Sequence, residues 1–199
     1  MIAIVNYGMG NLFSIYNALS KIGADPKVFT EPRFEGADGI VIPGVGSFGM
    51  CMSRLSQFQE ALFESLQSGT PMLGICIGMQ VLFDRSMESP GARGFGWIKG
   101  DVVRLPEGVT IPQMGWNNLS MKREVPLLEG IRDGDMFYFV HSYYCLPEDP
   151  SVVAATTEHG VEMAAAVIRD NLSATQFHPE KSGAKGLLIL ENFVRSTRC

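Results

Sequence analysis

Short apolar runs alternate with helix-spaced apolar positions through the first half of the chain. The runs that predict strands are Ile2–Val5, residues 26–30, Gly39–Ile42 and Met72–Ile75. Residues 12–22, 52–66 and 77–83 carry apolar side chains at helical spacing, which predicts helices there. This order predicts an α/β fold with a mostly parallel central sheet flanked by helices. In such a sheet the functional loops gather beyond the carboxyl ends of the strands.

The second half of the chain has shorter strand-like runs that are separated by turns. These runs are residues 97–105, 137–140, 152–157, 162–168 and 172–177. His159-Gly160 and Asp170-Asn171 are typical of hairpin turns, and the spacing over 184–194 predicts a closing helix. We therefore expect an antiparallel extension of the parallel sheet, and a single domain over residues 1–199.

The composition excludes several classes of protein. The chain has 199 residues, of which 46% are hydrophobic and 19% charged, and its formal net charge is -5. Because the chain is acidic and has no run of Lys or Arg, we do not expect nucleic-acid binding. It has no stretch of about 18 uninterrupted apolar residues, and its apolar start lacks the charged region of a secretory signal. We therefore expect no membrane span and a cytoplasmic protein.

The sequence contains no metal or cofactor motif. Its cysteines, Cys51, Cys76, Cys145 and Cys199, form no C-x-x-C pair, so neither a disulfide framework nor a metal site is expected. The Gly-x-Gly pattern before the first helix lacks the third glycine of a dinucleotide fingerprint, because Phe13 stands at that position. We expect a reduced chain without a cofactor.

Gly-Ile-Cys-Ile-Gly, residues 74–78, joins a predicted strand to a predicted helix. In this context the pattern is typical of a nucleophile elbow, with the sulfur of Cys76 in place of a serine hydroxyl. The flanking glycines allow other segments to approach closely, and the helix N-terminus favours a thiolate. A buried structural cysteine explains the pentapeptide about equally well.

A thiolate nucleophile needs a base, and His178 is the candidate. Pro179 favours extended backbone at His178, so that His178 and Glu180 point the same way and the carboxylate can orient the imidazole. A surface histidine beside a proline is the alternative. His141, at a predicted strand end, is a rival base or part of a substrate-contact loop.

The oxyanion of an acyl transfer also needs donors. In elbow enzymes one donor is the backbone N–H after the nucleophile, here that of Ile77. We expect the second from Pro43-Gly44-Val45-Gly46, hereafter the 43–46 loop, at the Val45 N–H. Each donor supplies roughly 3–4 kcal/mol of transition-state stabilisation. The alternative, a phosphate cradle, lacks the Lys-Ser/Thr pair of a P-loop.

Together these motifs resemble the class I, triad-type glutamine amidotransferases. The motifs are residues 43–46, 74–80 and 177–180. Further segments are similar to one branch of that family, the glutaminase subunits of imidazole glycerol phosphate synthase: residues 6–11, 44–49, 113–117, 141–144 and 178–183. The resemblance extends to about residue 195. One departure is Ile77, where leucine is common; only its backbone N–H enters the mechanism.

The resemblance implies a role for each matching residue. Cys76 would attack the side-chain amide carbon of L-glutamine, His178 would move the protons, and Glu180 would orient His178. Other matching positions hold the substrate in relatives: Gln80, Glu88, His141, Ser142 and Tyr143. Independently, Gln80 lies one helical turn after Cys76, which lets it face the same pocket. Glu88 is equally consistent with a solvated carboxylate at a helix end.

The predicted glutaminase domain occupies the whole chain, so we expect a separate partner that uses the ammonia. The resemblance implies a heterodimer with a (β/α)₈ cyclase subunit, which makes imidazole glycerol phosphate and aminoimidazole carboxamide ribotide in histidine biosynthesis. The candidate interface residues are Asn11, Trp116, Asn117, Tyr138 and Lys181. Tryptophan is a frequent interface anchor, although Trp116 could instead belong to the core.

Other functions fit parts of the pattern. The chain could be the glutaminase subunit of another class I amidotransferase, a catalytically silent binding subunit, or a stand-alone cysteine hydrolase or redox sensor. Residues 7–11 and 114–117 argue against the first, and the intact set of Cys76, His178 and Glu180 argues against the second.

Overall fold

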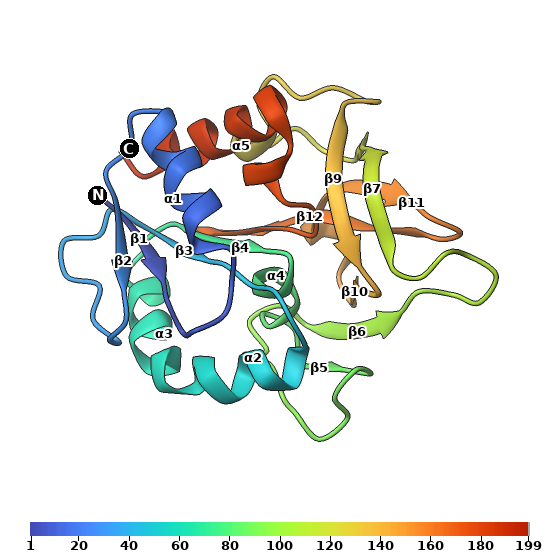
Figure 1. The fold of residues 1–199 in the computed structure, drawn as a ribbon, viewed down its shortest axis with the longest axis horizontal. Helices are drawn as coiled ribbons and strands as arrows, with labels where there is room; N and C mark the ends of the chain where they lie inside the picture. The colour runs from blue at the N-terminus through green and yellow to red at the C-terminus, as the bar shows by residue number, and fades with distance from the viewer. Residues whose placement is uncertain (199) are drawn as a thin grey trace.

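An eight-stranded sheet runs through the molecule in a computed structural model that describes residues 1–198 (Figure 1). Cys199 lies outside the described residues. The strands lie in the order β2 (Pro26–Phe29), β1 (Ile2–Val5), β3 (Gly39–Ile42), β4 (Met72–Ile75), β13 (Leu172–Thr175), β12 (Glu162–Arg169), β11 (Val153–Glu158) and β8 (Ser120–Met121). The strands from β2 to β13 are parallel. The remaining three are antiparallel, which confirms the predicted extension of a parallel sheet.

Helices cover both faces of this sheet. Figure 1 shows α1 (Leu12–Lys21) and α5 (Gly183–Ser196) on one side, and α2 (Phe48–Leu55) and α3 (Gln59–Gln67) on the other. The strand β1 is buried throughout: Ala3 and Val5 pack into one apolar cluster, and Ile2 and Ile4 into the other. Burial on both faces is why β1, β3 and β4 are continuous apolar runs instead of alternating ones.

Local signals account for α1. The Asn11 side chain accepts a hydrogen bond from the Ser14 N–H at 3.4 Å, and so caps the helix. Ile15, with Ala18 and Leu19, forms its buried face. The helix gives way to Gly23, whose φ of +75° suits a residue without a side chain.

Two other predicted helices have wrong boundaries. The expected helix 52–66 begins earlier, at Phe48, and a 3₁₀ turn at Ser56–Phe58 divides it into α2 and α3. Its start depends on a distant residue, because the Phe48 N–H donates to the Glu88 carboxylate at 2.7 Å. The helix expected over 77–83 is α4, which spans only Ile77–Gln80. The next three carbonyls, at residues 81–83, accept hydrogen bonds from the loop 95–98 instead.

Two smaller sheets lie beside the main one. The first joins β10 (Tyr143–Pro147), β6 (Gly100–Arg104) and β5 (Arg85–Ser86), and the second joins β7 (Gln113–Asn118) and β9 (Met136–His141). The sequence pattern did not predict β5, β7, β8 or β10; β5 and β8 have two residues each, and β7 is rich in polar residues. Short 3₁₀ turns occupy Pro126–Leu128, Pro150–Val152 and Pro179–Lys181. Among residues 1–198, no helix combines the length and the apolar character needed to cross a membrane.

Candidate active site

Cys76 occupies a strained turn between β4 and α4. Its φ of 56° and ψ of -107° are unusual for a residue with a side chain. The flanking glycines make the turn sterically feasible. A Cβ on Gly74 would lie 2.5 Å from the Gly78 carbonyl oxygen, and a Cβ on Gly78 would collide with the carbonyl oxygen of Ile42. The turn therefore presents Cys76 at the carboxyl edge of the sheet, the setting predicted for an elbow.

His178 and Glu180 form a buried pair. The His178 Nδ1 lies 2.8 Å from the Glu180 Oε1, and only 2% and 1% of the two side chains are exposed. The sequence argument placed both residues on extended backbone, but Glu180 lies in the 3₁₀ turn Pro179–Lys181. The turn brings the Glu180 carboxylate to the His178 ring. The expected contact therefore forms, but with a backbone conformation other than the expected extended one.

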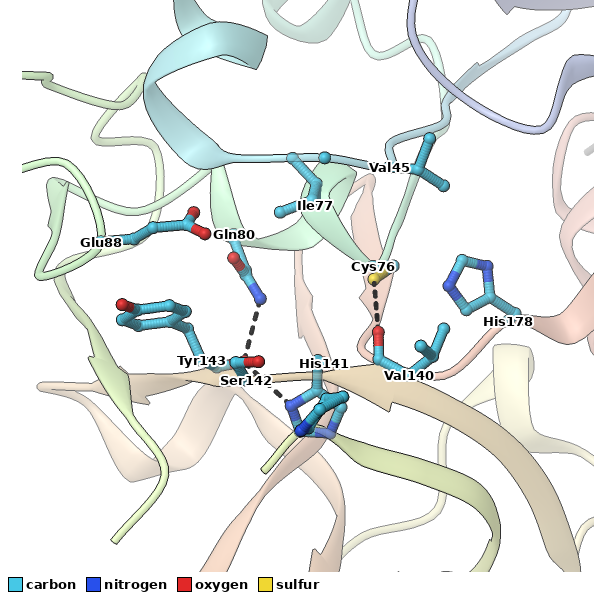
Figure 2. Close-up of a pocket in the computed structure, with 12 residues that line it drawn as sticks. Val45, Cys76, Ile77, Gln80, Glu88, Val140, His141, Ser142, Tyr143 and His178 are labelled. Atoms are coloured by element: carbon cyan, nitrogen blue, oxygen red, sulfur yellow. Dashed lines mark hydrogen bonds between the residues drawn. The ribbon is translucent and has the colours of Figure 1, made fainter. Parts of the chain in front are cut away.

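The position of the His178 backbone is set by neighbouring segments. Its N–H donates to the Tyr138 carbonyl at 2.9 Å, and its carbonyl accepts from the Ser182 hydroxyl at 2.6 Å. Figure 2 shows the imidazole beside the Cys76 sulfur. Among residues 1–198 the buried Nε2 makes no hydrogen bond. The ring is thus held through Nδ1 and leaves Nε2 for proton transfer.

The surroundings of His178 favour its charged form. Burial opposes protonation, but the Cys76 sulfur and the Glu180 carboxylate raise the pKa of His178 to about 10. The imidazole of His141 behaves in the opposite way, because burial lowers the pKa of His141 to about 4 despite its contact with the Tyr143 carbonyl. His141 is therefore neutral near pH 7, and its Nδ1 is 2.9 Å from that carbonyl. Of the two histidines, only His178 is paired with a carboxylate of the described residues 1–198.

Cys76 and His178 line one pocket with a volume of about 300 Å³ (Figure 2). Segments far apart between residues 45 and 178 contribute to its wall, which comprises Val45, Gly46, Cys76, Ile77, Gln80, Glu88, Pro112, Val140, His141, Ser142, Tyr143 and His178. Both expected oxyanion donors and all expected substrate residues thus face one cavity. The sequence argument missed Pro112 and Val140, because nothing in their local pattern indicates a site.

Gln176 is a further neighbour of the sulfur that the sequence argument missed. Its Nε2 lies 3.7 Å from the Cys76 Sγ, while its Oε1 accepts from Gln80 at 3.3 Å. Gln80 also donates to the Tyr143 carbonyl at 3.0 Å. Glu88 lines the pocket and accepts from the Phe48 N–H. Two buried amides therefore connect α4, β10 and the end of β13 around the sulfur.

The comparison with known families agrees with this arrangement. A family model described as "Glutamine amidotransferase class-I" matches residues 3–197. The chain belongs to the class I glutamine amidotransferases. Among curated members of the family it is 53% identical to "Imidazole glycerol phosphate synthase subunit HisH" of Methanothermobacter thermautotrophicus, over 100% of both chains. It is 47% identical to the protein of the same name from Dehalococcoides mccartyi, over 98% of this chain and 97% of that one.

Solved structures with low sequence identity to this chain share its fold. One, described as "glutamine amidotransferase", has a TM-score of 0.79 at 17% identity and covers 100% of this chain and 99% of that one. PurLQS from Thermotoga maritima has a TM-score of 0.80 at 19% identity, over 98% and 97% of the two chains. These likenesses agree with the α/β fold predicted from the sequence.

The expected interface residues of this glutamine amidotransferase lie outside the pocket. Trp116 is 53% exposed, which excludes the core alternative, and it packs edge-on against Tyr138 with ring centroids 6.3 Å apart. The Lys181 Nζ lies 5.8 Å from the centre of the Tyr138 ring. Asn117 donates to the Glu158 carbonyl at 2.8 Å, and Asn11 caps α1. The structure thus joins Trp116, Tyr138 and Lys181 in one surface cluster.

Proposed function

We propose that the chain hydrolyses L-glutamine to glutamate and ammonia through a thioester at Cys76, and passes the ammonia to a cyclase subunit in histidine biosynthesis. The observation that carries the proposal is the strained Cys76 turn in one pocket with His178, whose ring Glu180 holds. The name of the full-length relatives, at 47% and 53% identity, supports the assignment to imidazole glycerol phosphate synthase.

In the first half-reaction, the Cys76 thiolate attacks the carboxamide carbon of glutamine. A C–S bond forms, and the carbonyl π electrons move to oxygen. The N–H groups of Ile77 and Val45 stabilise this oxyanion, each by roughly 3–4 kcal/mol. When the intermediate collapses, the C–N bond breaks and the imidazolium of His178 gives its proton to the departing nitrogen. Ammonia leaves, and the glutamyl thioester remains on Cys76.

In the second half-reaction, His178 acts as the base. Its neutral Nε2 removes a proton from water while the water oxygen attacks the thioester carbon. The same N–H groups stabilise the second oxyanion, and collapse releases glutamate and the Cys76 thiolate. Glu180 accepts from Nδ1 throughout, which fixes the tautomer and stabilises the imidazolium in both half-reactions.

The substrate residues act by position and charge. Glu88 carries the charge that an α-ammonium group requires, and it lines the same cavity as Cys76. The buried Gln80 Oε1 has no hydrogen-bond partner among residues 1–198, so it is an available acceptor. Residues 141–143 line the opposite wall and offer backbone groups to the amino-acid end of glutamine.

The partner in this proposal is a (β/α)₈ cyclase subunit, bound as a heterodimer to the single domain 1–199. Ammonia is mostly protonated at neutral pH and then is not nucleophilic, so direct transfer to the next site conserves it. The surface cluster of Trp116, Tyr138 and Lys181 supports a docking surface, since aromatic side chains are enriched in interface cores.

The test measures glutamate released from glutamine by this chain together with the cyclase subunit and its ribulose-phosphate substrate. We expect release in the wild type and none in Cys76→Ala. Cys145→Ala is the matched control, because Cys145 is equally buried but lies outside the pocket. Absence of release in every mixture, or equal release by Cys76→Ala, would contradict the proposal.

A further inference from the structure

Two buried side chains that the mechanism above does not use lie behind the 43–46 loop. The loop presents Val45 and Gly46 to the pocket. Against its other side lie Tyr7, which follows β1, and Cys51, on α2, with exposed fractions of 4% and 0%. Neither side chain lines the pocket. Any effect of these residues on the reaction must therefore act through the loop.

Both side chains contact backbone carbonyls of the loop. The Tyr7 hydroxyl donates to the Pro43 carbonyl oxygen at 2.6 Å. The Cys51 Sγ lies 3.6 Å from the Val45 carbonyl oxygen and 3.8 Å from the Tyr7 hydroxyl oxygen. Burial raises the pKa of the Cys51 thiol to about 11 and the pKa of Tyr7 well above its ordinary value. Both groups are therefore protonated at neutral pH and can donate.

These two hydrogen bonds hold the peptide units before and after the Gly44–Val45 peptide. The Pro43 carbonyl belongs to the peptide before Gly44, and the Val45 carbonyl belongs to the peptide after Val45. The peptide between them carries the Val45 N–H. With its neighbours held, this peptide retains only rotation about the line through its two flanking Cα atoms, because peptide units are planar.

Close packing limits the same segment further. A Cβ added to Gly44 would lie 2.7 Å from the Ile77 Cβ and 3.0 Å from the Tyr7 hydroxyl oxygen. Gly44 is thus wedged between the tyrosine hydroxyl and the residue that follows the nucleophile. Ile77 also carries the other N–H expected to donate to the oxyanion. The Tyr7 hydroxyl therefore packs against the 43–46 loop, and the loop packs against the elbow.

We propose that Tyr7 and Cys51 are positioning residues that hold the peptide carrying the Val45 N–H in place beside Cys76, through the carbonyls of the 43–46 loop. The proposal rests on the glutaminase function proposed above. Neither residue touches the substrate, and both act by restricting the loop. Removing either hydrogen bond lets the loop backbone move, so the donor spends less time aligned with the developing charge.

The first test is Tyr7→Phe, which removes the hydroxyl and keeps the ring. Complete loss of an oxyanion donor lowers kcat about 10²- to 10³-fold, so we expect a misaligned donor to lower kcat about 10-fold or more. We expect KM to change less than about twofold, because the pocket wall is unchanged. The assay uses the complex with the cyclase subunit and its ribulose-phosphate substrate. Tyr16→Phe is the matched control, since Tyr16 is exposed on α1.

A second measurement separates positioning from general damage to the site. Alkylation of Cys76 by iodoacetamide, followed on the Cys76 peptide by mass spectrometry, depends on the thiolate and forms no oxyanion. We expect Tyr7→Phe to keep the wild-type alkylation rate while it loses turnover. Equal losses of alkylation and turnover would mean that Tyr7 only supports the fold, and would overturn the proposal.

Cys51→Ala is the second variant, with Cys145→Ala as its control. Cys51→Ala removes the donor to Val45, and we expect the same pattern of reduced kcat with unchanged alkylation. Wild-type kcat in both Tyr7→Phe and Cys51→Ala would overturn the positioning role while leaving the glutaminase function intact. Absence of glutamate release by the wild-type complex would instead overturn the proposed function, and the positioning role with it.

Discussion

Replacing Glu180 by glutamine changes one charge in the buried pair and almost no volume. The Glu180 Oε1 lies 2.8 Å from the His178 Nδ1, and both side chains are almost fully buried. Solvent cannot screen this contact, so the lost charge acts directly on the imidazole. The amide also has an NH₂ group, which can donate to Nδ1 and favour the tautomer with its proton on Nε2.

The size of the effect follows from the contact. A buried hydrogen bond to a charged group contributes about 1.5–3 kcal/mol, which corresponds to roughly 10- to 160-fold in rate if the imidazolium of the transition state loses it. A wrong tautomer adds to this loss. The analogous change in a serine-type triad costs about 10⁴-fold, and this sets the upper end. We expect Glu180→Gln to lower kcat for glutamine hydrolysis by about 10²- to 10⁴-fold.

The assay compares kcat and KM for glutamate release by the wild type and Glu180→Gln in the cyclase complex. Glu60→Gln is the matched control, because Glu60 is exposed on α3. Thermal unfolding of the free chain verifies that the variant folds. A folded Glu180→Gln variant within about threefold of wild-type kcat would refute the argument that Glu180 stabilises the imidazolium.

Three further predictions concern stability and docking. The pKa of His178 is about 10 in the folded chain, against an ordinary value of 6.5. Between these pH values the folded state binds more protons than the unfolded state, so the free energy of unfolding should fall as the pH rises. Urea unfolding across this pH window measures that free energy, and a value independent of pH would refute the prediction. Gly78→Ala should lose about 3 kcal/mol and about 6–12 °C in Tm, because its Cβ meets the Ile42 carbonyl, and calorimetry that finds an unchanged Tm would contradict this. Trp116→Ala should weaken cyclase binding about 30-fold in titration calorimetry without lowering the Tm of the free chain, and unchanged affinity would remove Trp116 from the interface.

Much of the fold was predictable because its elements carry their own signals. Three of the four parallel strands of the first half, β1, β3 and β4, are short apolar runs, and the structure has all four strands within one residue of the prediction. The first helix begins at a capping asparagine and ends beside a glycine. Hydrophobic periodicity indicates which side chains of a single element are buried. The boundaries of these elements depend on little beyond that local pattern.

The candidate chemistry was predictable to the same extent. Gly74 and Gly78 flank Cys76 because the turn has no room for side chains there, and that requirement is visible as a five-residue pattern. His178 and Glu180 are two residues apart, so their contact needs only a local turn. The sequence by itself therefore determined the strand runs, the elbow and the histidine–carboxylate pair.

Contacts between distant segments were decided by the tertiary structure alone. The start of α2 depends on Glu88, 40 residues from Phe48. Gln176 reaches the Cys76 sulfur across 100 positions, and Tyr7 reaches the Pro43 carbonyl across 36. The exposure of Trp116 depends on how β7 pairs with β9. Hydrogen bonds and burial of this kind depend on which distant segments the fold brings together. The side-chain periodicity within one segment carries no information about its distant neighbours.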